Sequence, residues 1–188
     1  FYFLEKRKGK IDGVVITGGE PLINQDILPF IEKIREKGYK IKLDTNGSSP
    51  QRLKEILEKR IVDYIAMDIK AAREDYSKVA GVNVNIDDIE ESMSALAAFG
   101  IDYEFRTTMC PIIIDNNIRE MTPEDIEKIA EWISRIDKNA KFYIQPFVPV
   151  AGRLVNPELE KFSRTREDVM KKAKELAGKF LTRVYIRN

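Results

Sequence analysis

The sequence contains no histidine and a single cysteine, Cys110, among its 188 residues. Because it has no imidazole, the chain cannot form a serine–histidine triad, a histidine-ligated zinc site or a histidine general base. One cysteine excludes an internal disulfide framework and a zinc site built from cysteines, and it fits a reducing cytoplasm. Any chemistry must therefore use carboxylates, lysine, arginine or a bound cofactor.

A strong net charge and long apolar runs are also missing. The 32 lysine and arginine residues nearly balance the 31 aspartates and glutamates, so the net charge of +1 favours neither nucleic acid nor an anionic membrane as a partner. No apolar stretch is long enough to cross a bilayer, and none resembles a secretory signal. The length and the 43% hydrophobic content suit one domain with a sizeable core.

Hydrophobic periodicity predicts a chain of alternating strands and helices, which is an α/β fold. The expected strands are residues 13–17, 40–45, 62–69, 102–109, 141–147 and 182–187. Amphipathic helices are expected between them, such as 26–37 with Ile27, Phe30, Ile31 and Ile34 on its apolar face. Repeated βα units predict a mostly parallel sheet with outer helices, and their short length favours a barrel or partial barrel over a flat doubly wound sheet.

Two segments fall outside this repeat. Residues 1–8 have the pattern of a helix end closed by Gly9, so we expect further sequence before Phe1. Residues 148–163 form the longest stretch without periodicity. We expect them to form a surface loop that acts as a mobile rim and helps to admit a partner.

The stretch 14–22, Val-Val-Ile-Thr-Gly-Gly-Glu-Pro-Leu, is the centre of the predicted site. Its β-branched residues predict a buried parallel strand. Gly18 and Gly19 allow positive φ angles and let a ligand approach the main chain, while Pro21 fixes the exit direction of the chain after Glu20. The alternative is an ordinary tight turn with an incidental acid.

Polar residues recur at the ends of the later predicted strands: Asp44, Asn46, Asp68, Lys70, Arg106 and Gln145. Charges that point into a parallel barrel must be paired or bound to a ligand, because burying an isolated charge is costly. We therefore expect Glu20 and the charged members of this set to converge at one mouth of the barrel. Carboxylates there suit an ammonium or sulfonium group, and the lysine and arginine suit a carboxylate.

Each of these residues also has a simpler interpretation. Asp44 with Asn46 and Gly47 could be turn chemistry, and Asp68 with Lys70 could be a local salt bridge. Arg106 could pair with Glu104 on an exposed edge strand. The recurrence of the pattern at successive strand ends favours a common site over these separate explanations.

Five short motifs occur in order over most of the chain: Gly18-Gly19-Glu20-Pro21, Asp44-Thr45-Asn46-Gly47, Met67-Asp68-Ile69-Lys70, Phe105-Arg106-Thr107-Thr108 and Gln145-Pro146-Phe147. Together they resemble the radical S-adenosylmethionine (radical SAM) enzymes. Within that superfamily they resemble the activating enzymes of glycyl-radical proteins. The nearest resemblance is to the activating protein of anaerobic ribonucleoside-triphosphate reductase, followed by pyruvate formate-lyase activating enzyme.

This resemblance implies a partial (βα) barrel and a cofactor site. It implies that Gly18, Gly19 and Glu20 hold the methionine end of S-adenosylmethionine and that Gln145 lies near the adenosine. The further cofactor-binding residues that it implies are Pro21, Asp44, Asn46, Asp68, Lys70 and Arg106.

The resemblance also implies the chemistry and the partners. In the family, a reduced [4Fe-4S] cluster cleaves S-adenosylmethionine to a 5′-deoxyadenosyl radical, which removes hydrogen from a glycine of a partner protein. The implied partner is a glycyl-radical enzyme of the anaerobic ribonucleotide reductase or formate-lyase type. The implied electron donor is a flavodoxin or a ferredoxin.

One feature of the family is missing. The family binds its cluster through a Cys-x3-Cys-x2-Cys loop after the first barrel strand, and this chain has no such loop. Cys110, which precedes Pro111, is expected to be a small buried side chain and not a ligand. We therefore expect residues 1–188 to be a core domain that lacks the first strand and the cluster loop, contains no metal ligands and is inactive alone.

Three other functions remain open from the residues. The chain could belong to a radical SAM enzyme that acts on a small molecule or on another protein. It could be a non-radical barrel aldolase that uses Lys70 as its Schiff base, since a lysine beside an acid can serve that role. It could also be a binding module without catalysis.

Overall fold

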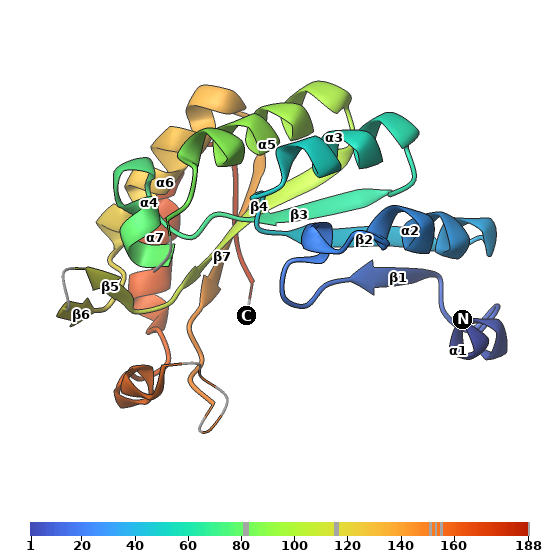
Figure 1. The fold of residues 1–188 in the computed structure, drawn as a ribbon. Coiled ribbons are helices and arrows are strands. Elements are labelled where there is room, and N and C mark those ends of the chain that lie inside the picture. The colour runs from blue at the N-terminus through green and yellow to red at the C-terminus, as the bar shows by residue number, and fades with distance from the viewer. Residues whose placement is uncertain (81–82, 115–116, 151, 153, 155, 188) are drawn as a thin grey trace. The chain divides into compact units, whose positions relative to one another are not determined.

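The computed structural model describes residues 1–80, 83–114, 117–150, 152, 154 and 156–187. Six of its strands form a mostly parallel sheet with flanking helices (Figure 1). The predicted α/β class is therefore confirmed. The chain divides into two compact units, Phe1–Asp68 with Asp87–Tyr103 and Ile69–Ile86 with Glu104–Asn188.

The first unit contains three parallel strands. β1 (Gly13–Ile16) pairs with β2 (Lys40–Thr45), and β2 pairs with β3 (Tyr64–Asp68). Its helices are α1 (Tyr2–Lys6), α2 (Ile27–Glu36), α3 (Pro50–Lys59) and α5 (Ile86–Phe99, from Asp87 on), with a short 3-10 helix η1 (Pro21–Ile23) after β1. These elements follow the predicted order.

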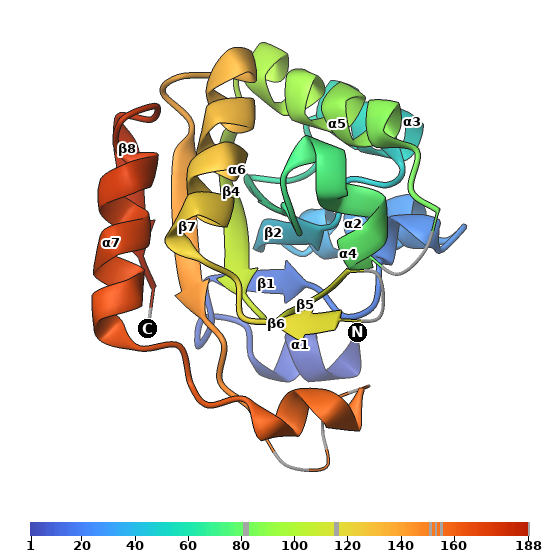
Figure 2. The same ribbon diagram turned by 90° about the vertical axis from the view of Figure 1, so that its left-hand side faces the viewer.

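The second unit also contains three parallel strands, β4 (Asp102–Met109, from Glu104 on), β7 (Lys141–Pro146) and β8 (Arg183–Ile186), paired in that order. An antiparallel hairpin of β5 (Ile112–Ile114) and β6 (Asn117–Arg119) was not predicted. The helices are η2 (Arg73–Asp75), α4 (Tyr76–Ala80), α6 (Pro123–Ile136), η3 (Pro157–Lys161) and α7 (Glu167–Ala177). Helices α6 and α7 pack against each other, and α7 contacts β7 and β8 (Figure 2).

Alternation along the strands separates a core face from a polar face. In β2, Ile41 and Leu43 are buried, whereas Lys42 and Asp44 on the opposite face are only partly covered. In β7, Phe142 and Ile144 are likewise fully buried. In these two strands the partly covered polar side chains lie on the face opposite the large apolar ones, whereas Thr45 of β2 and Glu104 of β4 are polar and buried.

Two predictions about burial were wrong. Residues 14–17 were expected to form a buried strand, but Val15 is 54% exposed, Thr17 is exposed and Ile16 is the buried residue of β1. Among the described residues, β1 pairs with β2 alone and is the first strand in the order of the sheet, so it is an edge strand. Val15 is exposed for this reason. Phe30 was expected on the inner face of α2, but it is exposed and its ring lies 5.6 Å from that of Phe1.

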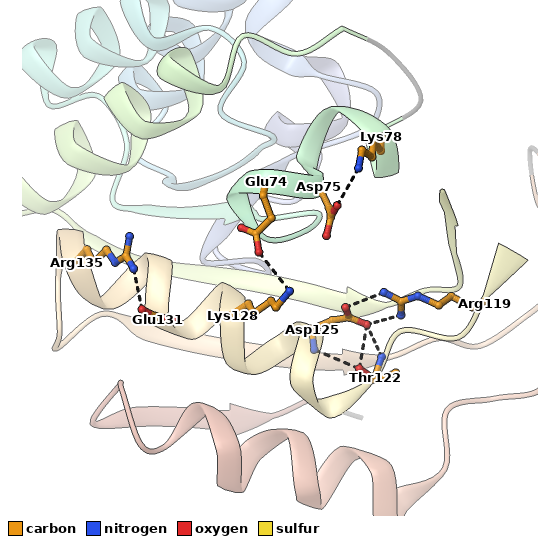
Figure 3. Close-up of polar contacts among 9 residues, drawn as sticks. All are labelled: Glu74, Asp75, Lys78, Arg119, Thr122, Asp125, Lys128, Glu131 and Arg135. Atoms are coloured by element: carbon orange, nitrogen blue, oxygen red, sulfur yellow. Dashed lines mark hydrogen bonds and ion pairs between the residues drawn. The ribbon is translucent and has the colours of Figure 1, made fainter. Parts of the chain in front are cut away.

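The start of α6 is fixed by a polar cluster (Figure 3). The Thr122 side chain accepts a hydrogen bond from Asp125 N, and the Asp125 carboxylate accepts one from Thr122 N, which is a capping box. Arg119 donates two hydrogen bonds to the same carboxylate, at 2.6 and 2.9 Å. Burial raises the pKa of Asp125, but the bonds from Arg119 and Thr122 outweigh it and lower the pKa overall. One carboxylate thus joins β6 to the first turn of α6.

Residues 148–163 contain the 3-10 helix η3, and residues 151, 153 and 155 lie outside the described part of the chain. The base of this segment is closed by two bonds between Phe147 and Thr165. Phe147 N donates to Thr165 Oγ1 at 2.9 Å, and Thr165 N donates to Phe147 O at 3.0 Å. The role of this segment as a mobile rim stays a prediction. Within the described residues, no helix combines the length and the apolar character that crossing a membrane requires.

Candidate cofactor-binding site

The turn after β1 has an open backbone. Gly18 and Gly19 have φ angles of +95° and +44°, which L side chains rarely adopt. A Cβ atom added to either glycine would meet no heavy atom within 4 Å. The main chain at these two residues is therefore exposed, and the positive φ angles agree with the prediction, while the approach of a ligand stays a prediction.

Glu20 follows this turn, and its carboxylate joins two segments of the first unit. Oε1 accepts hydrogen bonds from Leu22 N at 3.2 Å and from Thr45 Oγ1 at 2.7 Å. Oε2 accepts one from Asn46 N at 2.6 Å. The carboxylate therefore caps η1 and holds the end of β2 at the same time, so it is not the incidental acid of an ordinary turn.

The end of β2 is fixed from its other side as well. Thr45 is 3% exposed, and its hydroxyl accepts a hydrogen bond from Gly47 N at 3.1 Å while it donates to Glu20. The Gly47 carbonyl accepts a 2.7 Å bond from the hydroxyl of Ser92 on α5, which is fully buried. A chain of hydrogen bonds thus runs from Glu20 through Thr45 and Gly47 to helix α5.

Asp44 and Asn46 lie at the same end of β2 but make different interactions. The Asp44 carboxylate lies 2.8 Å from Lys42 Nζ, so two residues on one face of β2 form an ion pair. The Asn46 side chain accepts a hydrogen bond from Ser48 N at 2.9 Å, which is turn chemistry. Asp68 is the last residue of β3 and is partly exposed.

The remaining predicted residues belong to the second unit. Lys70 is exposed and follows Ile69, whose N–H donates to Arg106 O at 2.9 Å, so the segment carrying Lys70 runs beside Arg106 on β4. Thr107 Oγ1 adds a 2.8 Å bond to Ile69 O. Gln145 on β7 is the register partner of Thr108 on β4. These three predicted residues therefore lie on adjoining segments of one unit.

Glu104 has a different partner from the one its spacing suggested. It is 1% exposed, and both of its oxygens accept bonds from Arg187, at 2.7 and 2.9 Å. The Arg187 guanidinium also lies 3.9 Å from the centre of the Tyr143 ring, which stacks on Tyr185 at 5.0 Å. The hydrogen bond to Glu104 raises the pKa of Arg187. Glu104 is therefore not an exposed surface residue, and its pairing with Arg106 stays an untested alternative.

The structure thus joins Glu20 directly to Asn46 in the first unit, and Lys70, Arg106 and Gln145 lie on adjoining segments of the second. The convergence of all the charged residues at one mouth stays a prediction. Sequence reasoning missed four residues that hold this machinery in place: Lys42, Thr45, Ser92 and Arg187. Thr45 lies inside a quoted motif, so a search for hydroxyls beside predicted ligands could have found it. Ser92 gave no such signal.

The described residues contain no set of metal ligands. No group of three histidine, cysteine, aspartate or glutamate side chains among them could hold a metal ion. Cys110 is partly buried, and this burial raises the pKa of its thiol, although the nearby Lys70 charge opposes the rise. The thiol form is therefore favoured, although Cys110 is only partly buried and not the fully buried side chain that was expected.

The sequence also matches known proteins. The radical SAM superfamily matches residues 2–133. A Methanocaldococcus jannaschii protein provisionally named a glycyl-radical enzyme activating enzyme is 28% identical over 181 residues, covering 94% of this chain and 70% of that protein. A second protein of that organism, provisionally named a GTP 3′,8-cyclase, is 24% identical over 177 residues, covering 93% of this chain and 54% of that protein.

A solved structure shares the fold. The crystal structure of a domain of pyruvate-formate lyase-activating enzyme from Bacteroides vulgatus aligns with a TM-score of 0.68, over 95% of this chain and all of that domain. The aligned sequences are 16% identical, so this likeness concerns the fold alone. It confirms the predicted arrangement of mostly parallel strands with outer helices, as in a partial barrel.

Proposed function

Because the chain belongs to the radical SAM superfamily, we propose that it is the S-adenosylmethionine-binding core of an enzyme that activates a glycyl-radical protein. The observation that carries the proposal is the open Gly18-Gly19 turn followed by a carboxylate whose orientation is fixed. Bound S-adenosylmethionine would supply the radical chemistry. The protein would contribute binding, orientation and electrostatics.

The residues of the turn fit the methionine end of this cofactor. The uncovered main chain at Gly18 and Gly19 offers hydrogen-bonding groups, and the space beside each glycine is open. The Glu20 carboxylate accepts three hydrogen bonds and, with two oxygens, can accept a further one from an amino group. Asp44 would add negative charge to the same end of the site.

The second unit carries the cationic residues of the predicted site. Lys70 and Arg106 would bind the carboxylate of the methionine end, since an arginine can hold a carboxylate through two parallel hydrogen bonds. Gln145 would contact the adenosine. We place Pro21, Asn46 and Asp68 in the cofactor site through their positions at the strand ends, next to residues that bind directly.

The iron–sulfur cluster of the family does not fit the described residues. Clusters of this type are held by cysteine thiolates, and the sequence has only Cys110. No group of ligands among the described residues replaces them.

The partner in this proposal is a glycyl-radical protein, with a flavodoxin or ferredoxin as the electron donor. The name of the M. jannaschii relative supports this assignment, and the chain spans 70% of that protein's length. A test is to mix the full-length protein, reduced and supplied with S-adenosylmethionine, with a glycyl-radical enzyme from the same source. A glycyl radical seen by electron paramagnetic resonance supports the proposal, and its absence despite cofactor cleavage argues for another substrate.

A small molecule is the second candidate substrate. The relative named a GTP 3′,8-cyclase supports it, because that protein matches 93% of this chain. In the same experiment, turnover of GTP without a glycyl radical would favour this candidate. Neither of the two relatives has the name of an aldolase, so the alternative with Lys70 as a Schiff base gains no support from them.

Cofactor binding can be tested apart from activity. In the full-length protein, Lys70→Ala and Arg106→Ala should each weaken S-adenosylmethionine binding by about 1.5–3 kcal/mol, the usual range for a hydrogen bond to a charged group. Calorimetric titration measures the change. Lys171→Ala on α7, which removes a largely exposed lysine, is the matched control. Unchanged affinity in both folded variants would remove Lys70 and Arg106 from the site.

A further inference from the structure

The Thr45 hydroxyl links Glu20, which follows the predicted cofactor turn, to Gly47 after the end of β2. It donates to Glu20 Oε1 at 2.7 Å and accepts from Gly47 N at 3.1 Å. A hydroxyl carries one proton, and an N–H can only donate. Gly47 N therefore fixes the direction of the network, and the single Thr45 proton must go to the Glu20 carboxylate.

The surroundings of Thr45 hold this hydroxyl in place. The residue is 3% exposed, so water does not readily replace either of its hydrogen bonds. A β-branched side chain in a strand has few rotamers, which limits the positions that its oxygen can take. Glu20 Oε2 is held separately by Asn46 N at 2.6 Å. The carboxylate is thus fixed at both oxygens by residues 45 and 46.

The Gly47 end of the network is also anchored. Ser92 Oγ donates to Gly47 O at 2.7 Å, and Ser92 is fully buried in α5. The peptide group that donates to Thr45 is therefore attached to a helix of the core and not to a free loop. Displacement of Thr45 would move Glu20 directly, whereas displacement of Ser92 would reach Glu20 only through Gly47 and Thr45.

We infer that Thr45 is a positioning residue that orients the Glu20 carboxylate toward the amino group of S-adenosylmethionine, with Ser92 supporting it through Gly47. This inference rests on the proposed function. Loss of the Thr45 hydroxyl should therefore weaken contacts to the methionine end of the cofactor and leave the binding of the adenosine end unchanged. A ligand without the amino-acid end should therefore not sense the loss of the hydroxyl.

The test compares two ligands on three proteins. Thr45→Val removes the hydroxyl with little change of shape, and Thr45→Ser keeps it. In the full-length protein, Thr45→Val should weaken S-adenosylmethionine binding about tenfold, the equivalent of one hydrogen bond to a charged group. The affinity for 5′-methylthioadenosine, which lacks the amino-acid end, should change by less than about twofold. Thr45→Ser should bind both ligands nearly as the unaltered protein does.

The outcomes separate this inference from the proposed function. Unchanged S-adenosylmethionine affinity in Thr45→Val, or equal weakening of both ligands, would overturn the positioning role alone. Failure of the unaltered protein to bind S-adenosylmethionine would overturn the proposed function and the inference with it. If Thr45→Val does not fold, Ser92→Ala replaces it and should show a smaller loss with the same selectivity, while equal loss for both ligands would again overturn the role.

Discussion

Two glutamates, one in each unit, have opposite surroundings. Glu104 is buried, and both of its oxygens are paired with the charged guanidinium of Arg187. Glu20 accepts its hydrogen bonds from uncharged donors, namely two backbone N–H groups and the Thr45 hydroxyl. These donors orient the charge of Glu20 without cancelling it. A carboxylate paired with a cation thus has a structural role, whereas one held by uncharged donors can still bind a cation. The position of the acid in the strand pattern does not distinguish the two.

The largest expected effect comes from breaking the Glu104 pair. Arg187→Gln removes the cation that pairs with both oxygens of the buried Glu104 carboxylate. Loss of one partner of a buried pair costs about 3–5 kcal/mol, and because the Arg187 side chain is 36% exposed we reduce this to about 2–3 kcal/mol of unfolding free energy. Urea unfolding measures the loss.

The control for this variant is Arg183→Gln, which changes an exposed arginine on the same strand, β8. It should alter the unfolding free energy by less than about 0.5 kcal/mol, as surface substitutions usually do. Equal losses in the two variants would mean that Glu104 does not depend on Arg187, and the structural half of the comparison would fail.

A smaller effect, on binding, is expected at the other glutamate. Glu20→Gln keeps the size of the side chain but removes its charge, so S-adenosylmethionine binding should weaken by about 1.5–2 kcal/mol. Glu104→Gln should leave that affinity unchanged. Calorimetric titration of the two full-length variants side by side tests this, and a loss of affinity in both would erase the distinction between the two carboxylates.

A third carboxylate combines both kinds of partner and should give the smallest effect. Asp125 accepts bonds from Arg119 and from the uncharged donors of Thr122 (Figure 3). Because its pKa is lowered on folding, its contribution is complete above the unfolded pKa of about 4 and is lost as the pH falls through the folded value. Asp125→Asn should therefore be less stable by about 1 kcal/mol at pH 6, and the difference should shrink toward pH 3.

Urea unfolding at several pH values measures this difference. Glu124→Gln, in the same first turn of α6 but exposed, is the control and should show a smaller difference at every pH. A gap between the unaltered protein and Asp125→Asn that stayed constant down to pH 3 would contradict the lowered pKa.

The sequence predicted the elements that repeat. The bounds of β4, Asp102 to Met109, agree with the prediction, although Glu104 and Phe105 are both buried and interrupt the alternation of burial. The buried residues Ile27, Ile31 and Ile34 of α2 were likewise expected from helical spacing. Phe30 shares that spacing and is exposed, since periodicity gives a direction around the helix but not how far the neighbouring core extends.

The residues of the candidate site stay predictions, and the hydrogen bonds that connect them were not predicted. Gly18, Gly19 and Glu20 were identified because strand ends in parallel sheets form sites. The bond between Glu20 and Thr45 joins residues 25 positions apart, and the bond between Gly47 and Ser92 spans 45. Such contacts depend on how the strand ends approach one another, which local patterns do not specify. The same reason explains why Arg187 was not recognised as the partner of Glu104, 83 positions away.

The packing around Gly47 places an evolutionary constraint on a distant position. A Cβ atom at residue 47 would lie 2.0 Å from Met67 Cε, and the φ angle of +76° disfavours L side chains in any case. A descendant sequence with a side chain at position 47 would therefore have to displace the flexible end of Met67, or shorten that residue, and would still carry backbone strain. Substitution at position 47 alone should be purged, so change at these two positions should be rare and, where it occurs, concerted.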